Sequence, residues 1–213
     1  MNSIVSETTL KAIEFGILGL LVSLGIACLA MFAWRWQAVG NVRASARPCL
    51  EKLAHALSGD LAAIAAPAGS VSGESAAADR LVRIGIGNSH LCPDALDKLL
   101  EMQETRERES LERGCQLLGT VGANAPFLGL TGTVIGILSA FRRMASEGGG
   151  GVEVMSAISG ALIATAAGLI VAIPAVVLYN LLKSRIKRTM NTLSEIRGLL
   201  MARSLQSVAK EVF

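Results

Sequence analysis

The chain has 213 residues, of which 52% are hydrophobic and 17% are charged, and its formal net charge is +3. Its apolar residues gather in three uncharged runs, each about as long as the ~20 residues needed to cross roughly 30 Å of hydrocarbon. This pattern indicates an integral membrane protein and argues against a soluble domain. The basic residues lie beside these runs without interleaved aromatic residues, so a nucleic-acid partner is not expected.

Residues 15–34 are predicted to form transmembrane helix 1, preceded by a periplasmic N-terminus over residues 1–14. A cleaved signal peptide is the main alternative. We favour a retained helix, because the preceding segment carries Lys11 among acidic residues instead of a basic cluster, and because the run is longer than a typical signal core. The residues around Cys28 faintly resemble a lipoprotein cleavage site, but they lie in the middle of the run, so this alternative is set aside.

Residues 35–114 are predicted to be a cytoplasmic helical segment with a flexible linker near 65–78, where Ala, Gly, Ser and Pro accumulate. The stretch Pro93–Glu112 is rich in Leu, Glu, Lys and Arg and predicts an amphipathic helix with a proline at its first position. The charges over 104–113 are expected to form a solvated face and not a binding site. Residues 79–86 are too short and glycine-broken for an assignment.

The second and third runs predict transmembrane helices over 115–141 and 154–182, joined by a short periplasmic loop over 142–153 and followed by a cytoplasmic C-terminal helix over 183–213. The expected fold class is an all-α integral membrane protein with three transmembrane helices, of which the second and third extend into the cytoplasm. Neither of these two runs contains Asp, Glu, Lys, Arg or His. A carboxylate that helps ions to cross should therefore come from a partner.

The positions of the basic residues predict the orientation in the membrane. The positive-inside rule places the N-terminus outside, and the middle segment and the C-terminus in the cytoplasm. Arg142 and Arg143 are exceptions, because they end the second run on the periplasmic side. The residues that set this orientation are Arg35, Arg43, Arg47, Lys52, Arg106, Arg108, Arg113, Lys183, Arg185, Lys187 and Arg188.

Each of the last two runs carries a threonine among small residues at helical spacing, namely Thr133 and Thr165. Small residues let helix backbones approach and leave room for water or a guest helix, whereas lipid contact favours bulky side chains. We therefore predict that both hydroxyls line an ion path. For each threonine a structural alternative stays open, because its hydroxyl can bond a carbonyl of the preceding turn. The residues predicted to pack the helices are Gly129, Gly132, Gly136, Gly160, Ala164, Gly168 and Ala172, and those predicted to bend them are Pro126 and Pro174.

The polar residues outside these runs give no sign of catalysis. The four cysteines lack CxxC spacing, and the two histidines lie far apart in the sequence. Disulfides, a metal site and other cofactors are therefore not expected. There is also no glycine-rich phosphate loop, no GxSxG elbow and no paired carboxylates in an apolar setting, so the chain is not expected to be an enzyme.

Two strings in the C-terminal half resemble a known family of membrane motors. The sequences GANAPFLGLTGTVIGILSAF and SGALIATAAGLIVAIPAVVLYNLL are similar to the second and third transmembrane helices of the ExbB, TolQ and MotA family, and most similar to ExbB and TolQ. The first run matches by position only, and the middle segment hardly at all.

The resemblance implies a stator subunit of the bacterial inner membrane, driven by protons. In this family a ring, expected to be a homopentamer, encloses a dimer of a single-span protein of the ExbD or TolR type, which supplies a membrane aspartate. Thr133 and Thr165 match threonines that line the ion path near that aspartate. Ala164 precedes Thr165 where sodium-driven relatives tend to carry a second hydroxyl, which favours protons. The driven effector would be of the TonB, TolA or motility type.

One departure from ExbB and TolQ leaves the driven machine open. Their third helix usually carries a glutamate where this chain has Gly160, and Glu153 is expected at the outer mouth, where it does not replace the missing acid. A gliding-motility or other specialised motor of the same family is therefore an alternative. An alternative of a different class is a membrane assembly scaffold that conducts no ions.

Overall fold

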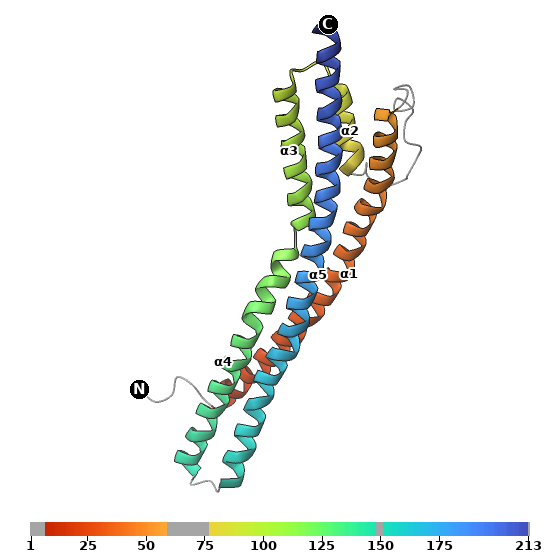
Figure 1. The fold of residues 1–213 in the computed structure, drawn as a ribbon. Helices are drawn as coiled ribbons and strands as arrows, with labels where there is room; N and C mark the ends of the chain where they lie inside the picture. The colour runs from red at the N-terminus through yellow and green to blue at the C-terminus, as the bar shows by residue number, and fades with distance from the viewer. Residues whose placement is uncertain (1–6, 59–76, 148–150, 213) are drawn as a thin grey trace. The chain divides into compact units, whose positions relative to one another are not determined.

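The computed structural model describes residues 7–58, 77–147 and 151–212, and these residues are helical except for turns at 88–92 and 113–114. The expected all-α class is confirmed for this part of the chain. Figure 1 shows the five helices: α1 (Glu7–Ser58), α2 (Ala77–Gly87), α3 (Pro93–Glu112), α4 (Cys115–Glu147) and α5 (Gly151–Val212). Three of these helices, α1, α4 and α5, are long and apolar enough to cross a membrane, as predicted.

Helix α3 has the bounds expected from its sequence, with Pro93 in its first turn. It ends at a turn in which Gly114 adopts a φ of 79°, a conformation that is strained for residues with a side chain. The second apolar run starts directly after this glycine. Residues 79–86, which had no sequence assignment, belong to α2.

Two sequence predictions about connecting segments need correction. The loop predicted over 142–153 is too long, because α4 continues to Glu147 and α5 begins at Gly151. The residues at the end of α4 include no proline or glycine that would stop a helix, and charge alone does not end one. Most of the linker predicted near 65–78 lies outside the described residues, but Ala77 and Ala78 are buried in the first turn of α2.

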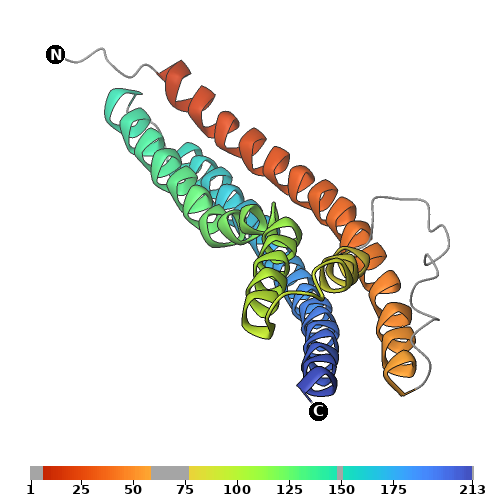
Figure 2. The ribbon, with the colours of Figure 1, turned by 90° about the horizontal axis from the view of Figure 1, so that it is seen from above.

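The chain divides into two compact units, and the first comprises Met1–Ala33 and Gly114–Leu181. In this unit α4 and α5 lie side by side in both views (Figures 1 and 2). Leu21 of α1 forms a buried core with Ala125 of α4 and Ala172 of α5. The partly buried apolar residues around this core are Ile17, Val121, Leu128, Ala167 and Val171.

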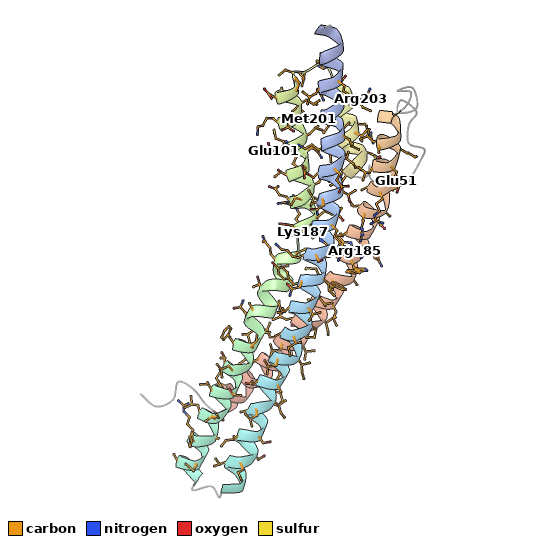
Figure 3. The ribbon with its side chains drawn as sticks, viewed as in Figure 1. Glu51, Glu101, Arg185, Lys187, Met201 and Arg203 are labelled. Carbon is orange, nitrogen blue, oxygen red and sulfur yellow. The ribbon has the colours of Figure 1, made fainter. Side chains whose placement is uncertain are left out.

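The second unit comprises Trp34–Arg113 and Leu182–Phe213, and it combines an apolar core with ion pairs. Figure 3 shows its side chains, with Arg185 directed from α5 toward α1, where its guanidinium lies 4.0 Å from the centroid of the Trp36 ring. Arg197 of α5 donates hydrogen bonds to both carboxylate oxygens of Asp97 and to Glu104 of α3. The largest fully buried side chains of this unit include Leu81, Leu96, Leu100, Leu193 and Ile196.

The charges of α3 do not all form a solvated face. Glu107 is only 5% exposed and accepts two hydrogen bonds of 2.6 Å from Arg80 of α2 and one from Gln103. The solvated-face prediction is therefore wrong for Glu107, because a turn of α2 covers it with a matching cation. On the exposed side of α3, Lys98 donates to Glu101, and this hydrogen bond lowers the pKa of the Glu101 carboxyl.

Replacing Glu107 with alanine is expected to release α2 from α3. Charge-assisted hydrogen bonds contribute about 1.5–3 kcal/mol each when both partners are held in place, so we expect a loss of stability of this order. The measurement is thermal unfolding in detergent combined with hydrogen exchange over residues 77–87. Glu109→Ala is the control, because Glu109 is exposed two residues away on the same helix. Equal protection of the α2 amides from exchange in both variants would contradict the role of the Arg80–Glu107 pair in holding α2 against α3.

Candidate ion path

The predicted path residues lie where α4 and α5 make backbone contact. A methyl group built on Gly129 would lie 2.7 Å from the carbonyl oxygen of Ala164 and 2.9 Å from Cα of Thr165. A methyl group built on Gly168 would lie 2.6 Å from the carbonyl oxygen of Ala125. Real Cβ atoms do not approach backbone this closely, so the contact requires glycine at both positions.

Other glycines of α4 extend this contact along both helices. A methyl on Gly132 would lie 2.6 Å from Cβ of Ala164, and one on Gly122 would lie 2.6 Å from Cγ2 of Val176. Gly119 similarly faces the ring of Tyr179, with the nearest atom at 3.2 Å. Gly119 and Gly122 were not among the residues predicted to pack the helices, although they continue the helical spacing of Gly129 and Gly132 toward the start of α4.

The remaining residues predicted to pack the helices divide into two groups. Gly136, Ala164 and Ala172 are buried. For Gly160, in contrast, no described residue of another helix has an atom within 4 Å of a methyl built on it. Gly160 lies one turn of α5 beyond Ala164.

Thr133 lies on α4 one turn beyond Gly129, and only 6% of it is exposed. Its hydroxyl donates a hydrogen bond of 2.7 Å to the backbone carbonyl oxygen of Leu130. The structural alternative considered for this threonine is therefore present in the single chain. The hydroxyl oxygen keeps its lone pairs, so Thr133 can still accept a hydrogen bond from water or from a protonated acid.

Thr165 differs from Thr133 in the hydrogen bonding of its hydroxyl. The Oγ1 atom of Thr165 is buried and has no hydrogen-bond partner among the residues that the structure describes. An unpaired buried hydroxyl costs about 1–3 kcal/mol, so such groups are rare in folded proteins. This hydroxyl therefore keeps both a donor and an acceptor that no described residue uses.

The two threonines share one antiparallel helix pair. Gly122 faces Val176, whereas Gly132 faces Ala164, so the two helices run in opposite directions. Thr165 lies at the level of Gly129, and Thr133 follows Gly129 by four residues, which corresponds to about 6 Å along the axis at 1.5 Å per residue. The structure thus places both threonines on facing helices, about one turn apart.

The apolar stretches that carry the two threonines contain no acidic group. Residues 115–141 and 154–182 contain no Asp, Glu, Lys, Arg or His. Within the described ranges, no three His, Cys, Asp or Glu side chains are grouped as metal ligands would be. Pro126 and Pro174 lie inside α4 and α5, which continue on both sides of each proline. Their predicted effect on helix direction stays a prediction.

Comparison with known proteins assigns the chain to a family. A family model described as the MotA/TolQ/ExbB proton channel family matches residues 74–195, which is more than half of the chain. The chain belongs to this family. The match contains α3, α4 and the part of α5 that carries Thr165, so Thr133 and Thr165 both lie inside the matched residues.

Individual relatives from this family cover a shorter stretch. The biopolymer transport protein ExbB of Xanthomonas campestris pv. campestris is 44% identical over 97 residues, which are 45% of this chain and 38% of that protein. The Tol-Pal system protein TolQ of Pseudomonas aeruginosa is 42% identical over 98 residues, which are 44% of this chain and 42% of that protein. The chain thus matches less than half the length of these two relatives. An ExbB of Aquifex aeolicus is 40% identical over 91 residues, or 62% of that protein.

Proposed function

We propose that the chain is the channel-forming stator subunit of a proton-driven motor in a bacterial inner membrane. Copies of the chain would form a ring, most simply a pentamer, around a single-span partner of the ExbD or TolR type that supplies a membrane aspartate. Membership of the proton channel family and the similarity to proteins named ExbB and TolQ support this function. The observation that links this function to a particular residue is the buried hydroxyl of Thr165, which has no hydrogen-bond partner among the described residues.

The chemistry of the two hydroxyls suits an acid that alternates between two protonation states. Thr165 can donate to a carboxylate, because its hydroxyl proton has no acceptor among the described residues. Thr133 already donates its hydroxyl hydrogen to the carbonyl oxygen of Leu130, so it can only accept a further hydrogen bond. A protonated acid or a water molecule can donate that hydrogen bond. Neither hydroxyl releases its own proton at neutral pH, so the partner would carry the proton while the threonines position it.

The same proposal fixes a membrane topology. Residues 1–14 and the connection near 148–150 would lie in the periplasm, and residues 35–114 and 183–213 would lie in the cytoplasm. The basic flanks of the three apolar stretches support this orientation. The continuity of α5 from Gly151 to Val212 supports a third span that extends as one helix into the cytoplasm.

The deciding experiment is proton flux into vesicles that contain the chain alone or together with its aspartate-bearing partner. We expect flux only when both proteins are present, because the apolar stretches 115–141 and 154–182 contain no acid of their own. Absence of flux from a stable complex of the two proteins would favour the non-conducting scaffold. Flux from the chain alone would contradict the role of the partner.

The machine that such a motor drives is a separate question. Gly160 stands where ExbB and TolQ usually carry a glutamate, and in the part of the chain that the structure describes no other helix has an atom within 4 Å of the methyl position. This position therefore has room for an acid but lacks one, which favours a specialised motor, such as one for gliding motility, as the second candidate. Co-purification of the effector would distinguish this candidate from the TonB and Tol machines.

A further inference from the structure

Arg185 of α5 carries a positive charge that forms no ion pair among the described residues. Its guanidinium lies 4.0 Å from the centroid of the Trp36 ring of α1, as Figure 3 helps to follow. Its Nη1 atom is buried and has no hydrogen-bond partner among the described residues. The indole face attracts the cation but carries no negative charge. Since a guanidinium keeps its proton in proteins, this partly buried cation calls for an anion.

Gly40 of α1 provides the space in which this guanidinium lies. A methyl group built on Gly40 would lie 2.7 Å from Nη2 of Arg185. Gly40 follows Trp36 by four residues, so the two lie on one face of α1. All three residues belong to the second compact unit. We name Trp36, Gly40 and Arg185 together the Arg185 site.

The segments around the Arg185 site contain basic residues without acidic ones. Residues 35–50 of α1 and 183–194 of α5 include Arg and Lys but no Asp or Glu. Both segments begin directly after an apolar run, at residues 34 and 182. In the topology of the proposed function, these positions correspond to the headgroup level of the cytoplasmic leaflet. Anionic lipids are present in that leaflet, and basic residues at its surface attract them.

Two tryptophans lie at the same level of the sequence. Trp34 is 68% exposed and Trp36 is 39% exposed. Tryptophan is enriched where membrane spans end, because its ring is apolar and its N–H group is polar. The exposed aromatic surface beside the cation suits a ligand that carries an anionic group on an apolar body. A phospholipid has this chemistry, whereas a free phosphate ion lacks the apolar part.

We propose that the Arg185 site binds the phosphate group of an anionic phospholipid from the cytoplasmic leaflet. The planar guanidinium matches two phosphate oxygens, and its hydrogen bonds to them are strengthened by charge. Arg185 as a whole is half-buried, so part of its side chain is accessible to a ligand. This inference rests on the membrane topology of the proposed function and adds a ligand site outside the contact of Thr133 with Thr165.

The test measures lipid binding to the full chain in a neutral detergent by native mass spectrometry. The probes are short-chain phosphatidylglycerol, which is anionic, and short-chain phosphatidylcholine, which has no net charge. We expect saturable binding of phosphatidylglycerol and at least about tenfold weaker binding in Arg185→Gln, because charge-assisted hydrogen bonds to phosphate are lost. Lys187→Gln is the matched control, because Lys187 is exposed on the same helix and the variant loses the same charge. A charge that acts only through the surface potential contributes about fivefold, so Lys187→Gln should lose no more than that.

Gly40→Leu tests the same site without removing the cation. Within 4 Å of the methyl position, the described residues contribute only atoms of the Arg185 guanidinium, so leucine would displace that group. Leucine also favours a helix more than glycine does, so the fold is expected to persist. We expect weaker binding of phosphatidylglycerol at unchanged thermal stability. This variant decides the proposal even if Arg185→Gln fails to fold, and unchanged binding in it would overturn the site.

Other results would also overturn the Arg185 site. Equal weakening by Arg185→Gln and Lys187→Gln would indicate a general basic surface. Glycerol phosphate that binds as tightly as phosphatidylglycerol would indicate a soluble phosphate ester as the ligand. Dissociation of lipid-free assemblies in Arg185→Gln would indicate pairing with an acid of a second copy.

The binding measurement is independent of proton flux. If the chain binds phosphatidylglycerol as expected but its assembly with the partner conducts no protons, the proposed function fails and the Arg185 site stands. If the assembly conducts while Arg185→Gln binds the lipid as tightly as the parent, only the Arg185 site fails.

Discussion

A leucine in place of Gly168 is expected to separate α4 from α5 and to lower the recovery of assembled protein from the membrane. A methyl group at this position would already lie 2.6 Å from the carbonyl oxygen of Ala125 and 3.2 Å from Cα of Gly129. Both are backbone atoms, which cannot rotate away as a side chain can. Overpacking costs about 1–3 kcal/mol where side chains adjust, so the loss should reach or exceed that range. Thermal unfolding in detergent and size-exclusion chromatography measure it.

Gly160 provides the matched control for this experiment. It lies on the same helix, two turns before Gly168, and among the described residues no atom from outside its own turn lies within 4 Å of a methyl built on it. Gly160→Leu introduces the same side chain and is expected to leave the unfolding temperature of the chain close to that of the parent. Equal losses from the two variants, or normal assemblies from Gly168→Leu, would mean that α4 and α5 do not meet at Gly168.

Replacing Thr165 with valine is expected to reduce proton flux sharply while the assembly remains intact. Valine keeps the shape of the side chain but removes the hydroxyl, which has no hydrogen-bond partner among the described residues. The chain therefore loses no bond, and its thermal stability should be unchanged or slightly raised. If the hydroxyl holds the partner's acid, a loss of about 1–3 kcal/mol at that step corresponds to a decrease of roughly 5- to 150-fold in flux.

Thr165→Ser separates the role of the hydroxyl from that of the methyl group. Serine keeps a donor and an acceptor at the same position, so we expect it to restore much of the flux that valine removes. The measurement is proton flux in vesicles with the partner present, compared at equal amounts of assembled protein. Full flux through Thr165→Val would refute the path-lining role, and a valine variant that fails to assemble would instead assign Thr165 to packing.

Much of the helical framework follows from local properties of the sequence. Uncharged runs of sufficient length predict the apolar parts of α1, α4 and α5, because backbone groups in hydrocarbon must be satisfied within a helix. The proline at the start of α3 and the charged residues that follow predict that helix to its ends. The spacing of Thr133 among glycines likewise predicts that it lies on a smooth face, since helical periodicity depends on sequence position alone.

Other features depend on which faces meet, and periodicity does not determine that. Glu107 and Glu109 have similar sequence surroundings, yet only Glu107 is buried, because Arg80 of α2 lies against it. Gly160 and Gly168 share a stripe on α5, yet only Gly168 touches α4. A local sequence pattern contains no information on the partner that covers each position.

In the candidate site, too, some features follow from the sequence and others depend on the neighbouring helix. Sequence spacing determined that Thr133 and Thr165 lie on faces lined by small residues and that no acid of the chain lies within those spans. Only the tertiary structure decided the hydrogen bonding of the two hydroxyls. The hydroxyl of Thr133 donates to the carbonyl oxygen of Leu130, whereas the hydroxyl of Thr165 is buried without a described partner. The physical reason is that burial and hydrogen bonding depend on the neighbouring helix, whose distance and direction are set by all the contacts between α4 and α5 together.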